Sequence, residues 1–210
     1  MSVLNKLASA LDRRDEVPNQ ELAQQIVTDN DTNAVKELVD NLKNKSKDIQ
    51  NDCIKVLYEI GELKPALIAD YGNNFVALLD SKNNRLQWGG MTALSSITSE
   101  NPKAIYAVLA KIVAAADKGS VITKDYAVNI LIKLCSIKEY ADDAFSLLNE
   151  QLLHSPTNQL PMYAERAVPI INENNKKLFV RTLSSRLDEI EKDTKRKRVE
   201  KVIKKFSDRT

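Results

Sequence analysis

The sequence predicts an all-α fold built from repeated pairs of helices. Only five glycines and six prolines interrupt a chain of 210 residues that is 43% hydrophobic. Its apolar residues recur at the spacing of helices rather than in the strict alternation of strands. The chain also aligns with itself when it is shifted by 37 residues, three times in succession. Such a period is typical of arrays in which no helix pair can bury its apolar stripe alone, so that neighbouring pairs stack.

The pattern of residues 1–30 predicts N-terminal capping helices. Residues 1–16 are amphipathic, and residues 19–29 form a weaker copy of the repeat. Their imperfect spacing and their polarity are expected at the end of an array, where the outer face meets water. The apolar residues that share one face of the first segment are Val3, Leu4, Leu7 and Leu11.

Residues 31–172 predict the regular repeats of period 37. Each repeat contains a first helix, a short polar turn and a second helix. The second helices cover residues 48–61, 85–98, 122–135 and 159–172. One of their columns is always small and contains Cys53, Gly90, Ala127 and Ala164. Another is always large and aliphatic and contains Leu57, Leu94, Leu131 and Val168. The first helices have an apolar column of their own, made of Leu42, Leu79, Ala116, Leu153 and Ile190.

Residues 173–210 predict a C-terminal capping repeat, with a first helix at residues 177–190 and a basic helix at residues 196–206. Residues 1–210 together are expected to form a single domain, since a chain of this length can bury a core as one continuous array.

Two successive glycines, Gly89 and Gly90, follow the only tryptophan, Trp88, inside a predicted helix. Each glycine costs about 1 kcal/mol relative to alanine in a helix interior. Gly90 belongs to the small column, so a close contact between helices explains it. The counterparts of Gly89 in the other repeats are not small, so Gly89 is expected to clear space beside Trp88 for a partner.

The stretch LLDSKNNRLQWGGMTALSSI, residues 78–97, resembles a HEAT repeat of the armadillo-like superfamily. Gln87 departs from the arginine that is usual in this family, and the same column contains Gln50, Lys124 and Pro161. The resemblance implies an α-α superhelix of about five to six stacked HEAT-like helix pairs, whose second helices line the concave wall. It says little about function. The residues that match the family pattern are Leu78, Leu79, Asp80, Leu86, Gly89, Gly90, Ala93 and Leu94.

Helical geometry predicts which residues of the second helices face away from their apolar stripe. Aromatic residues, methionine and arginine occur among them, and these types are enriched in protein interfaces. Trp88 has an alternative role as a core residue, since large aromatic side chains are mostly buried. Pro169 is expected to kink or end its helix early. The residues assigned to a partner-binding concave face are Asn51, Lys55, Tyr58, Trp88, Thr92, Asp125, Asn129, Met162 and Arg166.

Residues 192–205 form the second candidate site. They contain eight Lys or Arg against two acids, a net charge of +6 in a chain whose total is +2. Such a segment can contact phosphates or an acidic surface, but it also has the pattern of an ordinary terminal helix with a solvated basic side. The cations of its helix are Lys195, Arg196, Lys197, Arg198, Lys201, Lys204 and Lys205.

The repeat and the absence of catalytic motifs favour a non-enzymatic scaffold or adaptor that binds a protein partner. The alternative is a DNA-binding or DNA-alkylation-repair protein. One group of DNA glycosylases resembles stacked HEAT units and uses concave Trp, Asp and Arg residues, types that Trp88, Asp125 and Arg166 supply here. An enzyme-associated subunit is a third possibility, because lone carboxylates leave no readable motif. His154, the only histidine, is expected in a helix end or turn. No cofactor, metal site or membrane span is predicted, and a cytoplasmic location is expected.

Overall fold

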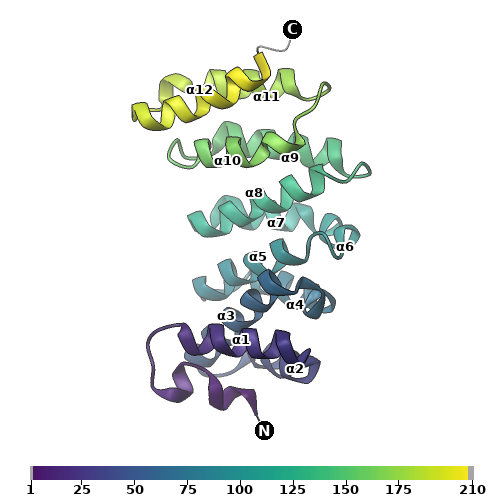
Figure 1. Cartoon of the computed structure of the whole chain (residues 1–210), viewed down its shortest axis with the longest axis vertical. Coiled ribbons are helices and arrows are strands. Elements are labelled where there is room, and N and C mark those ends of the chain that lie inside the picture. The colour runs from purple at the N-terminus through teal and green to yellow at the C-terminus, as the bar shows by residue number, and fades with distance from the viewer. Residues whose placement is uncertain (1, 208–210) are drawn as a thin grey trace. The chain divides into compact units, whose positions relative to one another are not determined.

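The computed structural model describes residues 2–207, and these form helices, turns and loops but no strands (Figure 1). The predicted all-α class is therefore confirmed. None of the helices in this part of the chain combines the length and the apolar character needed to cross a membrane. The chain divides into two compact units, Met1–Ala127 and Val128–Thr210. The single domain expected for residues 1–210 stays a prediction.

The first unit begins with two short 3-10 turns, η1 (Val3–Lys6) and η2 (Ser9–Leu11), followed by helix α1 (Val17–Asp29). Residues 3–11 thus form short 3-10 turns, and the N-terminal capping helices expected for residues 1–30 stay a prediction. The backbone N–H groups of Ala8 and Ser9 donate to the side chains of Asn19 and Asp52, at 3.0 and 2.8 Å. These bonds tie the segment to α1 and to the next repeat, and Leu11 is left 51% exposed.

The remaining helices of the first unit follow the predicted pairs. Those of the first layer are α2 (Thr32–Asp40), α4 (Gly72–Leu78), α6 (Pro102–Ala107) and α7 (Leu109–Lys118). Those of the second layer are α3 (Lys47–Leu63), α5 (Asn84–Ile97) and α8 (Val121–Cys135), which continues into the second unit. Short 3-10 turns connect them at η3 (Asn41–Lys43), η4 (Pro65–Leu67) and η5 (Ala69–Tyr71). Helices α3, α5 and α8 begin 37 residues apart, as the sequence period requires.

Helix α3 is central in the first unit, because it packs against α1, α2 and α5, while α4 packs on α5. The members of the small column in this unit are buried: Cys53 and Ala127 are at most 1% exposed, and Gly90 is buried. A Cβ atom on Gly90 would lie 3.0 Å from the Cβ of Leu78 and 3.1 Å from the carbonyl oxygen of Phe75. The role predicted for Gly90, a close contact between helices, is confirmed.

The role predicted for Gly89 is wrong. Gly89 is buried, and a Cβ atom there would lie 2.6 Å from Cγ1 of Ile54. Ile54 lies on α3 and is itself fully buried. The missing side chain therefore lets α5 approach α3 rather than opening space for a partner. The two glycines serve two different sides of one helix, Gly89 against α3 and Gly90 against α4.

The second unit contains α9 (Ala141–His154), α10 (Leu160–Ala167), η6 (Val168–Ile170), α11 (Lys176–Ser185), η7 (Leu187–Glu189) and α12 (Asp193–Ser207). Helix α12, yellow in Figure 1, packs on α10 and α11, and α11 also packs on α9. Helix α10 ends at Ala167 and tightens into η6 at Pro169, as the proline predicts. Arg186 donates to the carbonyl oxygens of Leu152 and Leu153, so it caps the C-terminal end of α9.

Candidate functional site

The main candidate site is a surface on α3 and α5, which we call the Trp88 surface and define by Asn51, Tyr58, Arg85 and Trp88. The ring of Trp88 is half-buried and lies 5.6 Å from the ring of Tyr58, tilted by 48°. The guanidinium carbon of Arg85, one helical turn earlier on α5, lies 5.6 Å from the indole ring. Trp88 is therefore held between an aromatic ring and a cation and keeps part of its indole exposed.

The Trp88 surface also includes a buried cation, Lys55. Lys55 is only 5% exposed, and its Nζ atom lies 2.9 Å from Glu16 and 2.5 Å from Glu59. Burial acts to lower the pKa of Lys55, but the hydrogen bonds and charges of Glu59 and Tyr58 outweigh it and raise this pKa. Lys55 therefore stays charged and fixes the position of Tyr58, whose ring lies 4.9 Å from the ammonium group.

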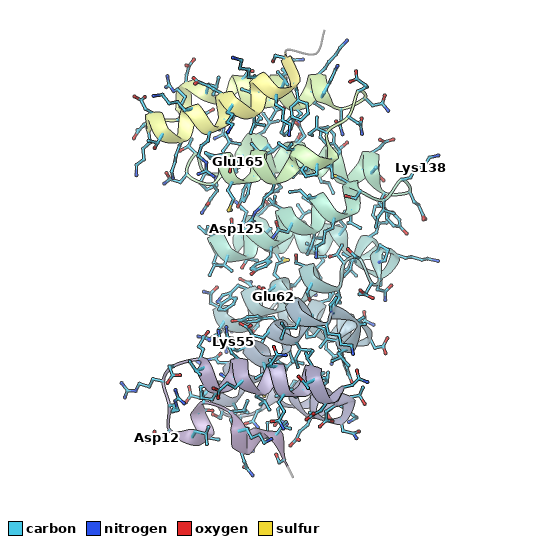
Figure 2. The ribbon with its side chains drawn as sticks, viewed as in Figure 1. Asp12, Lys55, Glu62, Asp125, Lys138 and Glu165 are labelled. Atoms are coloured by element: carbon cyan, nitrogen blue, oxygen red, sulfur yellow. The ribbon has the colours of Figure 1, made fainter. Side chains whose placement is uncertain are left out.

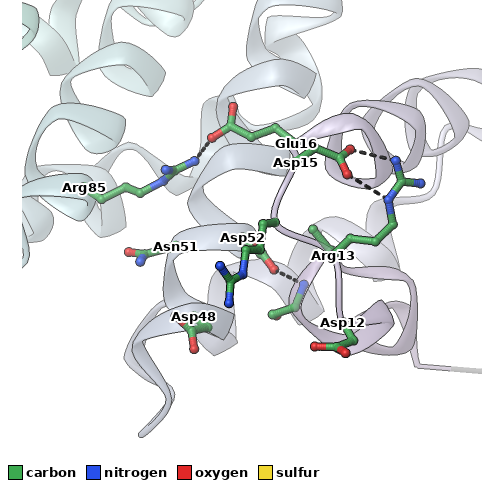
Figure 3. A pocket seen from close by; sticks show the side chains of 11 residues that line it. Asp12, Arg13, Asp15, Glu16, Asp48, Asn51, Asp52 and Arg85 are labelled. Carbon is green, nitrogen blue, oxygen red and sulfur yellow. Dashed lines mark hydrogen bonds and ion pairs between the residues drawn. The ribbon is translucent and has the colours of Figure 1, made fainter.

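Glu16 connects the two helices. Its carboxylate accepts a hydrogen bond from Arg85 on α5 (Figure 3) and forms an ion pair with Lys55 on α3, although Glu16 comes from the loop before α1. Burial also lowers the pKa of Arg85, whose Nε atom is buried without a hydrogen-bond partner among the described residues. One loop carboxylate thus holds both cations of the Trp88 surface in place.

A hollow of about 390 Å³ adjoins the Trp88 surface at Asn51 and Arg85 (Figure 3). Besides Glu16, two of its carboxylates already have partners: Asp15 is paired with Arg13 at 2.8 Å, and Asp52 accepts from Asn19 at 2.7 Å. The hydrogen bond from Arg13 is the main cause of the lowered pKa of Asp15. Five carboxylates face three arginines in the hollow, which is lined by Ala8, Ser9, Asp12, Arg13, Arg14, Asp15, Glu16, Asp48, Asn51, Asp52 and Arg85.

The predicted concave-face residues of the first unit differ in exposure. Asn51, Trp88 and Asp125 are partly exposed, as expected. Lys55 and Tyr58 are mostly buried, and Thr92 is only 1% exposed, which differs from the outward position expected for them. The hydroxyl of Thr92 donates to the carbonyl oxygen of Trp88 at 2.9 Å, so Thr92 supports the helix instead of facing a partner. The projection was too coarse because neighbouring helices and the loop before α1 cover part of α3 and α5.

The predicted residues of the second unit lie on two helices that pair through one hydrogen bond. Arg166 on α10 is exposed, and its Nη1 atom donates to Oδ1 of Asn129 on α8 at 3.1 Å. Met162, one turn before Arg166, is partly exposed. The three residues of the types that the DNA glycosylases use are divided between the units, with Trp88 and Asp125 in the first and Arg166 in the second. That they act together in binding DNA stays a prediction.

The basic helix α12 contains two kinds of cation. Lys195 contacts the side-chain oxygen of Asn158 at 2.7 Å, Arg196 donates to the carbonyl oxygen of Ile190, and Arg198 pairs with Glu165 at 2.6 Å. Glu165 is labelled on α10 in Figure 2. These three cations attach α12 to the rest of its unit. On α12, four exposed lysines form no ion pair with any residue in 2–207: Lys197, Lys201, Lys204 and Lys205.

The two cysteines and His154 show little sign of a nucleophilic or metal-binding role. Burial raises the pKa of both the Cys53 and the Cys135 thiol to about 12, so both are protonated near neutral pH. His154 lies at the end of α9 with a side chain that is 78% exposed. Within residues 2–207, no three His, Cys, Asp or Glu side chains are grouped to hold a metal ion.

Comparison with known proteins identifies the fold. No protein-family model matches the sequence, and no curated protein matches it. Among solved structures, a designed armadillo repeat protein in complex with the peptide (KR)4 is similar with a TM-score of 0.68, at 16% identity over 90% of this chain and 87% of that chain. The chain has the armadillo/HEAT-like repeat fold.

Two further structures with the armadillo repeat agree. A second designed armadillo repeat protein has a TM-score of 0.65 and 15% identity, over 97% of this chain and 100% of its own. A third, computationally designed for modular peptide recognition, has a TM-score of 0.66 and 16% identity, over 88% and 85%. At such identities the likeness concerns the armadillo/HEAT-like fold alone.

Sequence reasoning missed Arg85 and Glu16 in this armadillo/HEAT-like chain. Arg85 lies one turn before Trp88, and its proximity on α5 could have been found from helical spacing. Glu16 could not, because it lies in a loop outside the 37-residue period. No periodic signal connects it to Lys55 or to Arg85, which is 69 residues away.

Proposed function

We propose that the protein is a non-catalytic scaffold or adaptor that binds a peptide segment of a protein partner through the Trp88 surface. The observation that carries this proposal is the half-buried Trp88, whose ring lies between Tyr58 and Arg85 beside a hollow. Tryptophan, tyrosine and arginine are the residues that most often dominate the energy of protein interfaces.

The Trp88 surface is already ordered before a partner arrives. Tyr58 is held by packing and by Lys55, and Arg85 is held by Glu16. A partner therefore loses less free energy to the ordering of side chains than it would on a mobile surface. Asn51 adds a side-chain amide at the edge of the hollow, and such a group can bond a peptide backbone.

The structural neighbours support a peptide as the partner. One designed armadillo repeat protein is in complex with the peptide (KR)4, and another was designed for modular peptide recognition. In this proposal the second helices of the first unit form the binding wall. Asp125 on α8 then contacts the peptide in addition to Trp88.

A displayed library of random 12-residue peptides tests the proposal. Peptides selected on the full-length protein are measured against the wild type, Trp88→Ala and the control Tyr71→Ala. Tyr71 is also a partly exposed aromatic residue but lies in η5, beside the first-layer helix α4. We expect Trp88→Ala to weaken binding about 30-fold, the effect of losing roughly 2 kcal/mol at a hot spot, and Tyr71→Ala to weaken it less than about threefold.

Two results would contradict the proposal. The first is that the selected peptides bind Trp88→Ala as tightly as the wild type. The second is that no peptide from the library binds the wild type with a dissociation constant below about 100 μM.

A further inference from the structure

The outer face of α12 carries four lysines for which no ion pair is formed within residues 2–207. Lys197, Lys201, Lys204 and Lys205 are exposed. They lie opposite Val199 and Val202, which are buried against the rest of the second unit. Glu200 is the one exposed acid between the first and the last of them. The other cations of this helix have partners, as described above.

The fold itself does not explain this arrangement. Lys201 lies one helical turn from each of the other lysines, and like charges at this spacing repel one another. A cation in the last turn is favoured by the helix dipole, which accounts for Lys204 and Lys205. Lys197 and Lys201 lie earlier in the helix, where that effect has faded. Asp193 and Glu200 lie at helical spacing from Lys197 and offset part of this repulsion, and a bound anion offsets more of it.

The composition of this face indicates which anion fits. Lysine is depleted in protein–protein interfaces, which are enriched in aromatic residues, methionine and arginine. The exposed face of α12 contains no aromatic residue and no methionine, and the two arginines of the helix are bound to Ile190 and Glu165. What remains is a row of ammonium groups, which bind phosphate as point charges.

The spacing of the row fits a phosphate backbone. Lys197 and Lys204 lie about 10 Å apart along the helix axis, from a rise of about 1.5 Å per residue. Each strand of a duplex carries a phosphate about every 3.4 Å along its axis. The row therefore spans about three phosphates. We propose that α12 binds the phosphate backbone of nucleic acid without reading its sequence, at a site separate from the Trp88 surface.

Fluorescence anisotropy of the full-length protein with a labelled 20-base-pair duplex of arbitrary sequence tests this proposal. Four engaged lysines predict a slope of about −3.6 for the logarithm of the binding constant against the logarithm of salt concentration. Affinity is then expected to fall roughly 100-fold between 50 and 200 mM NaCl. A second duplex of scrambled sequence is expected to bind equally well.

Matched variants locate the site. The variant K197Q/K201Q/K204Q/K205Q is expected to lose binding. The control K43Q/K45Q/K82Q/K103Q removes the same charge from four exposed lysines of the first unit and is expected to bind like the wild type. The variant K197Q/K201Q is expected to reduce the salt slope by about two. Trp88→Ala is expected to leave duplex binding unchanged.

Three results would overturn the proposal. The first is equal loss of duplex binding in the α12 variant and in its control. The second is duplex binding by the wild type that does not weaken with salt, or no duplex binding at 50 mM NaCl. The third is a polyglutamate peptide that binds α12 as tightly as the duplex, which would assign this face to an acidic protein.

Discussion

The cations of the Trp88 surface and those on the outer face of α12 differ in what surrounds them. Lys55 and Arg85 share the carboxylate of Glu16, and Lys55 is almost fully buried. Lys197 and Lys201 are exposed and lie beside other lysines. A pair buried in this way is a structural element, because losing one partner leaves an uncompensated charge. An exposed and unpaired row costs the fold little and stays available for a ligand.

This difference shows why counts of charge are a poor guide to function in this chain. Residues 192–205 carry a net charge of +6, but three of their cations are used to attach α12 to its own unit. The Trp88 surface contains two cations that neither its local sequence nor the repeat singles out as paired. Only the partners of each side chain separate structural cations from those that a ligand can reach.

The largest expected effect is that of removing Lys55. We expect Lys55→Ala to lower the free energy of unfolding by about 2–3 kcal/mol, because Glu16 and Glu59 lose their common partner and Tyr58 loses a packing neighbour. This figure is below the full cost of a broken buried pair, since both carboxylates are partly exposed. Urea unfolding followed by the fluorescence of Trp88, the only tryptophan, reports on this unit.

Lys36→Ala is the matched control for Lys55→Ala. Lys36 also pairs with a carboxylate four residues later, Asp40, but the two side chains are 66% and 61% exposed. Its removal is expected to change the free energy of unfolding far less than the removal of Lys55, as for exposed pairs in general. Equal losses in the two variants would show that burial does not distinguish these cations.

Much of the fold could be predicted from the sequence because stacking repeats impose the same packing on each copy. The small column at Cys53, Gly90 and Ala127 is buried as predicted. The role of Gly89 was mispredicted because a glycine is needed there to make room for Ile54 on the facing helix. A comparison of equivalent columns does not reveal this contact. A period identifies which residues are equivalent but not which residues face each other.

The candidate site was less predictable than the fold. Trp88 and Asn51 were found from helical geometry, but the burial of Lys55 and Thr92 depends on neighbouring segments. Glu16 lies in a loop that also lines the hollow. Hydrogen bonds from the backbone N–H groups of Ala8 and Ser9 position the segment that leads into this loop. Such long-range contacts of an irregular segment leave no periodic signal in the sequence.

A smaller effect is expected at the ion pair that joins α12 to α10. The hydrogen bond from Arg198 lowers the pKa of Glu165, although burial acts in the opposite direction. A carboxylate with a lowered pKa in the folded state adds stability above its ordinary pKa of 4.5, and this contribution is lost as the pH falls through the lowered value. The side chains are 46% and 43% exposed, so the contribution is at most about 1 kcal/mol.

Arg198→Gln tests this contribution. We expect the variant to be less stable than the wild type at pH 7, and we expect the difference to shrink as the pH falls below 4.5. Amide hydrogen exchange of α12, measured across this range, follows the opening of this helix. A difference that is constant from pH 7 to pH 3 would mean that Arg198 stabilises α12 by packing rather than by its charge.

The smallest effect is expected for Lys201→Gln. Lys201 lies between Lys197 and Lys205 on α12, and removing it relieves repulsion at two spacings of four residues. A weak attraction to Glu165 is lost at the same time. We therefore expect hydrogen exchange to show α12 unchanged or stabilised by about 0.2–0.5 kcal/mol at low salt, with no difference at 0.5 M NaCl. If this variant instead destabilises α12 by about 1 kcal/mol or more, Lys201 supports the fold as Lys55 does, and the contrast between the two regions is wrong.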